Sequence, residues 1–265
     1  MKYTLGFVGC GNMGGALAQA ASKSMQGAEI ALCDFDKAKV ENLQTAFGGI
    51  ATTSQEIALG AKFVVLAVKP QVMESAIAEF AEVLRARTDA VVITMAAGLS
   101  ISAIRGYIGA DLPVIRIMPN TPAMLGVGMI LYATDKVTAE DEAAFLSAFA
   151  AAGAFDKIPE ADIDAASVVS GCGPAFVYAF IQALADGGVA CGVDEKKALL
   201  YAAQTAKGAA EMLFKYGDSQ TLIKNVCSPG GTTIEGVKTL EKENLNGVVS
   251  DAVKASYQRT LELKK

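Results

Sequence analysis

The first residues whose types and spacing indicate chemistry are Gly9-Cys10-Gly11-Asn12-Met13-Gly14, a GxGxxG pattern between an apolar run and a helical pattern. In that context the pattern is typical of a turn that binds a dinucleotide. Gly9 would allow the tight turn, Gly11 would let the backbone approach a pyrophosphate, and Gly14 would permit close packing of helix on strand. The alternative is a glycine turn without a ligand.

Asp34 ends the next apolar run, about 25 residues beyond Gly9. An acid at this place would bond the ribose 2′-hydroxyl of NAD and repel the 2′-phosphate of NADP. However, Lys37 and Lys39 lie close enough to favour a phosphate, and Asp36 is a candidate cap for the following helix. This loop leaves the choice of cofactor open.

Three further motifs follow later apolar runs, at the edge where open parallel sheets hold ligands. Val68-Lys69-Pro70 ends one run, and its lysine would either touch a ligand or lie in solvent. Ala96-Ala97-Gly98 ends the next with residues small enough to admit a nicotinamide ring. Two prolines stiffen the loop Met118-Pro119-Asn120-Thr121-Pro122 beside the same edge.

A glycine pair precedes two threonines in the stretch Ser228-Pro229-Gly230-Gly231-Thr232-Thr233-Ile234-Glu235. Thr232 and Glu235 have the spacing of a capping box, which predicts a helix that begins directly after the glycines. Free amides at such a helix start can hold a small carboxylate. The Thr233 hydroxyl can give or receive one hydrogen bond beside that anion. The alternative is an ordinary capped helix.

A second glycine stretch, Ser170-Gly171-Cys172-Gly173-Pro174, is predicted to open another helix with Pro174 in its first turn. Its glycines would let two backbones meet, either near a substrate or only within the packed protein. Cys172 is a weak candidate nucleophile, because the chain has no histidine to activate it.

The composition excludes several kinds of chemistry. The chain has 265 residues, no histidine and no tryptophan, so serine–histidine triads and the usual zinc and haem ligand sets are excluded, and no metal site is predicted. A net charge of -5 without basic clusters disfavours nucleic acid and anionic membranes as partners. Scattered cysteines and the lack of a secretory pattern predict a reduced, cytoplasmic protein.

The uncharged stretch 165–185 is predicted to be a helix buried in protein.

The elements that must position these motifs alternate in type through the first part of the chain. Apolar runs with strand character on both faces are Thr4–Val8, Glu29–Cys33, Phe63–Val68, Ala90–Thr94 and Pro113–Ile117. Helical patterns between them are Asn12–Met25, Lys37–Phe47, Ser54–Leu59 and Val72–Ala86. This alternation predicts an α/β fold, a Rossmann-like doubly wound parallel sheet, over residues 1–160.

Residues 161–265 are predicted to be helical throughout. The helical patterns are Pro174–Cys191, Glu195–Tyr216, Ser219–Asn225, Thr232–Lys242 and Gly247–Leu263. These helices have more apolar surface than one small bundle can bury, so we expect at least a dimer through this all-α C-terminal region.

Together these motifs resemble the Δ1-pyrroline-5-carboxylate reductases, the family that performs the last step of proline synthesis. The resemblance runs nearly end to end, and its most specific part is Ser228-Pro229-Gly230-Gly231-Thr232-Thr233. It also covers the GxGxMG pattern at 9–14, the motifs at 68–70 and 96–98, Arg116 to Pro122, and 170–174. It implies a Rossmann domain, a helical domain that binds substrate and forms a homodimer, and in many members a larger ring of dimers.

The resemblance implies reduction of 1-pyrroline-5-carboxylate to L-proline by hydride transfer from NADPH, with NADH accepted. Together with Asp34, the cofactor residues would be Gly9, Gly11, Asn12, Met13, Gly14, Val68, Lys69, Pro70, Ala96, Ala97 and Asn225. Substrate would lie on Gly230, Gly231, Thr232 and Thr233, with the catalytic Thr233 hydroxyl at the ring nitrogen. Asp34 departs from the small or polar residue that many members have there.

Two rival functions remain at this stage. One is a related β-hydroxy acid dehydrogenase or another imine reductase; the hydroxy acid enzymes commonly use a helical-domain lysine as acid and base, and Lys207 is the candidate. A dinucleotide-sensing protein without turnover would need the glycine loop but not Thr233.

Overall fold

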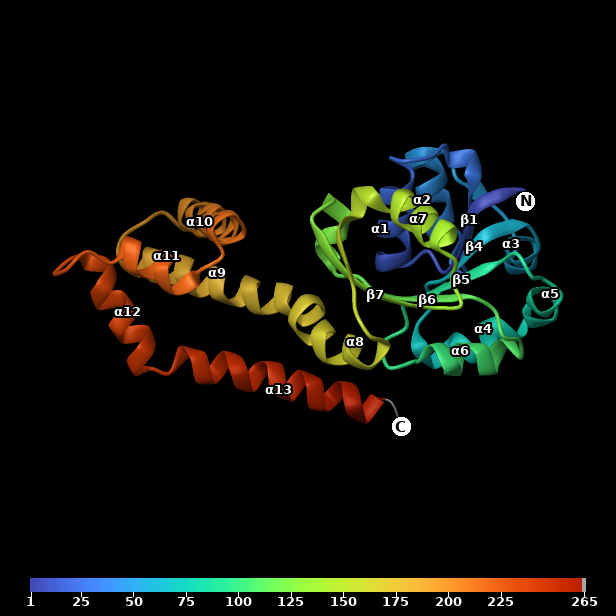
Figure 1. Cartoon of the computed structure of the whole chain (residues 1–265). Coiled ribbons are helices and arrows are strands. Elements are labelled where there is room, and N and C mark those ends of the chain that lie inside the picture. Colours follow the sequence, from blue (N-terminus) through green and yellow to red (C-terminus); the bar gives the residue numbers. More distant parts are fainter. Residues whose placement is uncertain (264–265) are drawn as a thin grey trace. The chain divides into compact units, whose positions relative to one another are not determined.

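A computed structural model of the chain describes residues 1–263. By its internal contacts the chain divides into two units (Figure 1). The first runs from Met1 to Cys172 and includes the chain from Tyr257 onward, and the second is Gly173–Ser256. The two units are described separately below.

The first unit contains one sheet of eight strands in the order β3-β2-β1-β4-β5-β6-β7-β8. The strands are β1 (Tyr3–Val8), β2 (Ile30–Cys33), β3 (Ile50–Ala51), β4 (Ala61–Leu66), β5 (Val91–Thr94), β6 (Val114–Met118), β7 (Gly128–Asp135) and β8 (Gly153–Lys157). Strands β1 to β6 pair in parallel, as the sequence predicts for a doubly wound sheet. The predicted fold class is confirmed.

The sheet continues beyond the strands that the sequence analysis identified. The missed strands are β3, β7 and β8, and β7 runs antiparallel to β6. The connection between Met118 and Gly128 holds only the short 3-10 helix Thr121–Leu125, whereas a parallel crossover needs about a dozen residues or more. The chain therefore turns back beside β6, and β8 then pairs in parallel with β7.

Helices cover both faces of this sheet (Figure 1). They are α1 (Asn12–Ala21), α2 (Lys37–Phe47), α3 (Ser54–Gly60), α4 (Met73–Ala78), α5 (Ala81–Arg85), α6 (Ile101–Ile108), α7 (Ala139–Ala148) and α8 (Glu160–Ser167). The single helix predicted over Val72–Ala86 is wrong, because the chain breaks into α4 and α5 at Phe80. Phe80 is 1% exposed, so burying its ring decides the local backbone.

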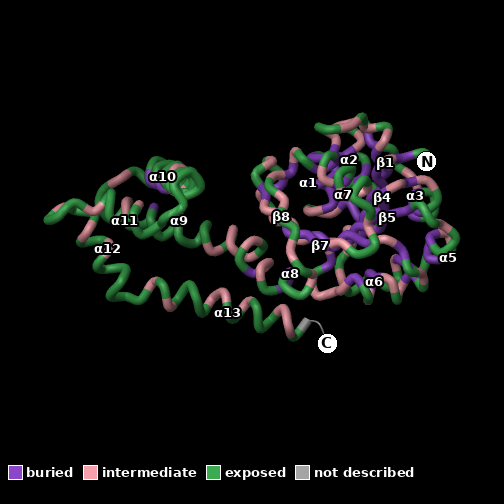
Figure 2. Tube along the Cα trace, in the orientation of Figure 1, coloured by how far each residue is buried: buried purple, intermediate pink, exposed green. Residues whose placement is uncertain are grey.

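Two apolar clusters form the core of the first unit, one on each face of the sheet. In β4, Phe63 and Val65 enter one cluster and Val64 and Leu66 enter the other. The buried residues follow the sheet through the whole unit (Figure 2). Burial on both faces explains why these strands read as continuous apolar runs.

The second unit is helical, as predicted. Its helices are α9 (Gly173–Ala190), α10 (Glu195–Tyr216), α11 (Ser219–Val226), α12 (Thr232–Lys242) and α13 (Leu245–Leu263), whose last residues count with the first unit. Among its described residues only Ala185, Ala198 and Ala202 form a buried cluster, between α9 and α10. Most of this unit is exposed in the single chain (Figure 2).

A π-helical turn, Val168–Cys172, joins α8 to α9 without a break in the helical chain. The predicted α-helix is confirmed with Pro174 in its first turn, because α9 begins at Gly173, but the residues before it are helical as well. Proline lacks the N–H for an interior helical bond, and the wider π turn directly before it changes the bonding pattern there.

By length and composition, Glu160–Ala190 could cross a membrane, and 11% of its most apolar window is buried in the chain. The prediction that residues 165–185 form a helix is confirmed, but within one chain that helix is largely uncovered. Its apolar composition therefore cannot be explained by the core of a single copy.

Candidate functional site

The glycine loop lies between β1 and α1 and has the geometry that its three glycines predict. Gly9 has a φ of +103°, and a Cβ there would lie 2.6 Å from the carbonyl carbon of Ala67. A Cβ on Gly14 would lie 2.3 Å from the Gly9 oxygen, whereas one on Gly11 would meet no heavy atom within 4 Å. The protein's own packing thus requires Gly9 and Gly14, and the open space at Gly11 leaves room for a ligand.

The carboxyl ends of four strands meet beside this loop. The sheet register pairs Val8 with both Cys33 and Leu66, and Leu66 with Thr94. The Gly9 amide donates to the Cys33 oxygen at 2.8 Å, which ties the glycine loop to the end of β2. The strand order reverses between β1 and β4, and open α/β sheets bind ligands at such a switch point.

Both carboxylate oxygens of Asp34 accept hydrogen bonds from the backbone. Oδ2 accepts from the Cys10 amide at 2.6 Å, and Oδ1 accepts from the Asp36 amide at 2.8 Å. Asp36 caps α2 by accepting from the Ala38 amide at 3.1 Å, which confirms it as the N-cap. The Lys39 Nζ lies 3.9 Å from Asp34 and 3.6 Å from Asp36. The glycine loop therefore orients the Asp34 carboxylate, and Lys39 is shared between two acids.

A pocket of about 470 Å³ opens between the end of β2 and helix α4. It is lined by Val8, Gly9, Cys33, Asp34, Phe35, Ser54, Val68, Val72, Ser75, Ala76 and Glu79. Three predicted cofactor residues, Gly9, Asp34 and Val68, thus line one cavity. No sequence motif indicates Phe35, Ser54 or Glu79 as pocket residues, and Ser54 and Glu79 reach the pocket only through the packing of α3 and α4.

The remaining predicted residues of the first unit lie on the neighbouring loops. Asn12 is an exposed residue at the start of α1, and Met13 follows it half-buried. Lys69 is exposed and precedes the short turn that Pro70 opens after β4. After β5, Ala96 is buried and Ala97 exposed. These side chains share the carboxyl edge of the sheet but do not line the 470 Å³ pocket.

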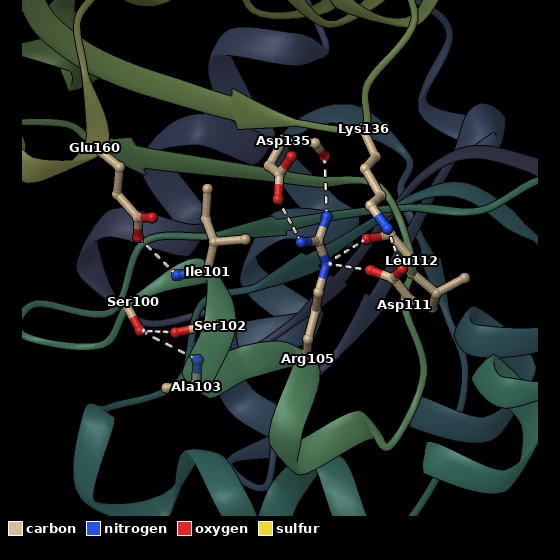
Figure 3. Close-up of polar contacts among 10 residues, drawn as sticks. All are labelled: Ser100, Ile101, Ser102, Ala103, Arg105, Asp111, Leu112, Asp135, Lys136 and Glu160. Carbon is tan, nitrogen blue, oxygen red and sulfur yellow. Dashed lines mark hydrogen bonds and ion pairs between the residues drawn. The ribbon is translucent and has the colours of Figure 1, made fainter.

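Polar contacts anchor helix α6, which follows the Ala96-Ala97-Gly98 loop. The Ser100 hydroxyl accepts from the Ala103 amide at 3.1 Å, and Glu160 Oε1 accepts from the Ile101 amide at 2.7 Å. Arg105 donates to the Leu112 oxygen at 2.8 Å and pairs with Asp135 (Figure 3). These bonds hold the loop after β5 in place.

Arg116 is buried near this anchor and ties β6 to α8. It lies 2.5 Å from Asp164 and 3.4 Å from Glu160. Asn120 donates from Nδ2 to the Ser170 oxygen at 2.9 Å and accepts from the Met129 amide at 3.0 Å. The motif from Arg116 to Pro122 therefore positions the π-helical turn.

The two cysteines nearest the glycine loop are poor nucleophiles. Burial, with the nearby Asp34 charge, raises the pKa of the Cys10 thiol to about 12. Burial is also the largest cause that raises the pKa of Cys33. Thiols with raised pKa values stay protonated and unreactive near neutral pH. Within residues 1–263 no three histidine, cysteine or acidic side chains could hold a metal ion.

In the second unit, helix α12 begins at Thr232 with Gly231 as its N-cap. The predicted capping box does not form, because Thr232 is the first helical residue and Glu235 lies one position too far along. Glu235 instead pairs with Lys238 at 2.7 Å. No described side chain caps this helix start, and Thr233 is exposed directly beside it. The uncapped amides and the Thr233 hydroxyl are therefore accessible to a small anion.

Asn225 and Lys207 also belong to the second unit. Asn225 is exposed near the end of α11 and lines a pocket of about 460 Å³ with Met212, Tyr216, Asp218, Thr221 and Leu222. Lys207 is exposed on α10. The predicted substrate residues and Asn225 thus lie in one unit, and all other predicted cofactor residues lie in the other.

Two family models match this chain. One, for pyrroline-5-carboxylate reductase dimerisation, matches residues 160–263. The other, described as NADP oxidoreductase coenzyme F420-dependent, matches residues 4–98.

Relatives match the chain over its whole length. It is 36% identical to the pyrroline-5-carboxylate reductase of Escherichia coli (strain K12) over 270 residues, covering 100% of both chains. It is 38% identical to the enzyme of the same name from Synechocystis sp. over 271 residues, again with full coverage of both. A crystal structure of Plasmodium falciparum pyrroline carboxylate reductase with NADP bound superposes with a TM-score of 0.86, at 30% identity and full coverage of both chains.

Proposed function

This chain belongs to the pyrroline-5-carboxylate reductase family, and on that basis we propose which of its residues carry the reaction. The enzyme reduces 1-pyrroline-5-carboxylate to L-proline with NAD(P)H, the last step of proline synthesis. Hydride is added to the carbon of the cyclic C=N bond, and a proton reaches the nitrogen.

We propose that the first unit holds the cofactor. Gly9, Gly11 and Gly14 would bring the α1 helix start to the pyrophosphate, and Asp34 would lie at the adenosine ribose. This assignment fits the open space at Gly11 and the orientation of Asp34 by the Cys10 amide. When bound, the reduced nicotinamide supplies the hydride.

We propose that the remaining predicted cofactor residues also bind the dinucleotide. All of them lie in the first unit except Asn225, which lies on α11 of the second. Asn12 and Met13 would complete the loop around the dinucleotide, and Val68, Lys69, Pro70, Ala96 and Ala97 would line its nicotinamide end. Asn225, which is exposed on α11, would approach the cofactor from the helical unit. The support is the shared carboxyl edge of the sheet and the family's motifs.

We propose that the start of α12 holds the substrate on Gly230, Gly231 and Thr232. Because the Gly231 amide already donates to the Ser228 oxygen at 3.0 Å, the amides of the first helical turn from Thr232 onward would bind the substrate carboxylate, and the Thr233 hydroxyl would bond the ring nitrogen. The support is a helix start with no described side-chain cap, next to an exposed hydroxyl. A cyclic imine is more electrophilic than a ketone, so the reaction needs orientation more than a strong acid. This role suits a chain without histidine.

The α12 start carries this proposal, and one assay tests it against the rival functions. Oxidation of NADPH or NADH should occur with pyrroline-5-carboxylate and not with β-keto acids. Turnover with β-keto acids that depends on Lys207 would favour a hydroxy acid dehydrogenase. Binding of cofactor without turnover of any substrate would favour a sensor.

We also propose the domain roles and the assembly. Residues 1–160 would form the dinucleotide-binding domain, and 161–265 the helical domain for substrate binding and dimerisation, with a larger ring of dimers as a further step. A second copy, rather than lipid, would cover the apolar stretch Glu160–Ala190 of a cytoplasmic enzyme. Light scattering at micromolar concentration should give at least a dimer, and a monomer would contradict this.

A further inference from the structure

We propose that Glu79, together with Asp34, sets the choice between NADH and NADPH by placing two carboxylates at the adenosine end of the cofactor pocket. The inference rests on the proposed cofactor site and deepens it. The end of the second strand, where Asp34 lies, is a familiar position for an acid that binds the ribose 2′-hydroxyl. Glu79 belongs to no motif and follows helix α4.

The two acids line the same 470 Å³ pocket from different elements, Asp34 after β2 and Glu79 after α4. Backbone amides of Cys10 and Asp36 fix Asp34 on the β2 side. On the α4 side, the Ser54 hydroxyl donates to Glu79 Oε2 at 3.2 Å. Ser54 is only 8% exposed, so it gives Glu79 a fixed donor. Each carboxylate therefore has a donor in place before any ligand binds: two backbone amides for Asp34 and one hydroxyl for the exposed Glu79.

Their charges act on the same region. Cys33 lines the pocket beside both acids. Burial is the largest cause that raises the pKa of its thiol, and a hydrogen bond with the Ser54 backbone lowers it. The charges of Glu79 and Asp34 both raise it further. The described lining residues include no lysine or arginine, although Lys39, from outside the lining, lies 3.9 Å from Asp34. Two acids therefore face one nearby lysine, and the formal charge at the adenosine end of the pocket is negative.

This charge affects the two cofactors differently. A 2′-phosphate brings about 1.5 to 2 further negative charges, which two carboxylates would repel. A free 2′-hydroxyl can instead donate to a carboxylate, and hydrogen bonds to charged acceptors are the stronger ones. Asp34 and Glu79 should therefore weaken NADPH binding relative to NADH binding.

Lys39 is the rival determinant, because it could pair with a 2′-phosphate. Its Nζ already lies between Asp34 and Asp36. Lys37 lines a different pocket, with Asp34 and Glu41. A phosphate at Lys39 would have to displace its carboxylate partners or share them.

The test is fluorescence titration of the purified full-length chain with NADH and with NADPH, without substrate. The measured quantity is the Kd for NADPH divided by the Kd for NADH. We expect Glu79→Gln to lower this ratio ~3–10-fold and Asp34→Asn to lower it ~10–100-fold. Glu74→Gln is the matched control, because Glu74 is an exposed acid on helix α4, directly before Glu79 in the chain, and lies outside the pocket; it should change the ratio less than about twofold.

An unchanged ratio in Glu79→Gln would overturn the role of Glu79. A loss of NADPH binding above about tenfold in Lys39→Gln would assign the 2′-phosphate to Lys39 and overturn the repulsion argument. Because Glu79 is exposed, its variant should fold even where Asp34→Asn does not. Cofactor binding is measured without pyrroline-5-carboxylate, so a chain that binds cofactor but reduces no substrate would contradict the proposed reaction and leave this inference standing.

Discussion

In the first unit, consecutive residues of β4 enter two separate apolar clusters, and large rings such as Phe7, Phe63 and Phe80 are almost fully buried. In the second unit, three alanines form the buried cluster, while Phe214 is 88% exposed. A sheet covered by helices on both faces buries its apolar side chains within one copy of the chain. The few long helices of the second unit leave apolar side chains exposed to solvent in a single copy.

The difference indicates what each unit needs in order to be stable. Monomeric proteins rarely expose apolar patches of the extent seen on α9 and α10. Side chains such as Tyr178, Phe180 and Leu200 are each about half exposed or more in the single chain. The first unit should therefore depend on its own packing, and the second on a second copy of the chain. The predictions below test that contrast.

The largest expected effect comes from a charge on the open face of α10. Ala198 and Ala202 face α9, and Leu200 lies on the other side of the helix, 63% exposed. Burying an unpaired charge in an interface is costly, so Leu200→Arg should raise the dimer dissociation constant ~1000-fold or more. Sedimentation across a concentration series measures this.

Leu59→Arg is the matched control, because Leu59 is 68% exposed on α3 of the first unit. It should leave the dimer intact. Equal dissociation by both variants, or by neither, would contradict a specific role for the α10 face.

The second expected effect concerns the chemistry of the helical unit. Thr233→Ala should lower kcat/KM for pyrroline-5-carboxylate ~10–1000-fold, a loss of about 1.4–4 kcal/mol in transition-state stabilisation. Steady-state kinetics with saturating cofactor measure it. Thr239→Ala is the control on the same helix, since the Thr239 hydroxyl only bonds the Glu235 oxygen of its own helix. A Thr233 variant with unchanged kcat/KM would remove the proposed positioning role.

The third effect belongs to the first unit alone. A Cβ on Gly14 would lie 2.3 Å from the Gly9 backbone oxygen, so the glycine loop must move. Gly14→Ala should lower the free energy of unfolding by about 1–3 kcal/mol and weaken binding of either cofactor. Gly15→Ala should do neither, because its nearest neighbour would be an ordinary 3.5 Å away. Urea unfolding and cofactor titration distinguish them, and equal effects of both alanines would refute a specific requirement at Gly14.

The helices that local signals define could be predicted to the residue. Lys37–Phe47 begins after the capping side chain of Asp36 and ends at Gly48, whose φ is +78°. Glu195–Tyr216 likewise follows Asp194 and stops at Gly217, whose φ is +75°. Caps of this kind act within a few residues of sequence, so the pattern alone identifies them.

Features set by packing between distant segments could not be predicted. The break at Phe80 depends on a ring buried under the sheet, and β7 depends on a short return beside β6. The same reason explains the candidate site. Asp34 ends a strand and was found, whereas Glu79 lines the same pocket only because α4 packs beside the switch point. A sequence motif identifies residues that lie close to the glycine loop along the chain. It does not identify residues that become neighbours of the loop only when the sheet and helices pack.

The smallest expected effect concerns a partly exposed ion pair of the first unit. Because this unit has a closed apolar core, we expect such a pair to contribute little to its free energy of unfolding. Glu142 on α7 accepts from the Lys157 Nζ at 2.6 Å and from the Tyr132 hydroxyl at 2.9 Å. The bond from Lys157 is the main reason that the pKa of Glu142 lies below its usual value. A lowered pKa stabilises the fold above the unfolded-state pKa, and this stability is lost as the pH falls through the folded-state pKa.

Glu142→Gln should therefore cost less than about 1 kcal/mol of unfolding free energy at pH 7, because Lys157 is about half exposed, and this cost should shrink as the pH falls through the folded-state pKa. Urea unfolding over a series of pH values from 7 downward measures the difference, with Glu140→Gln on the same helix as the control. A cost as large as that of Gly14→Ala would mean that the first unit depends on its surface ion pairs as well as on its core.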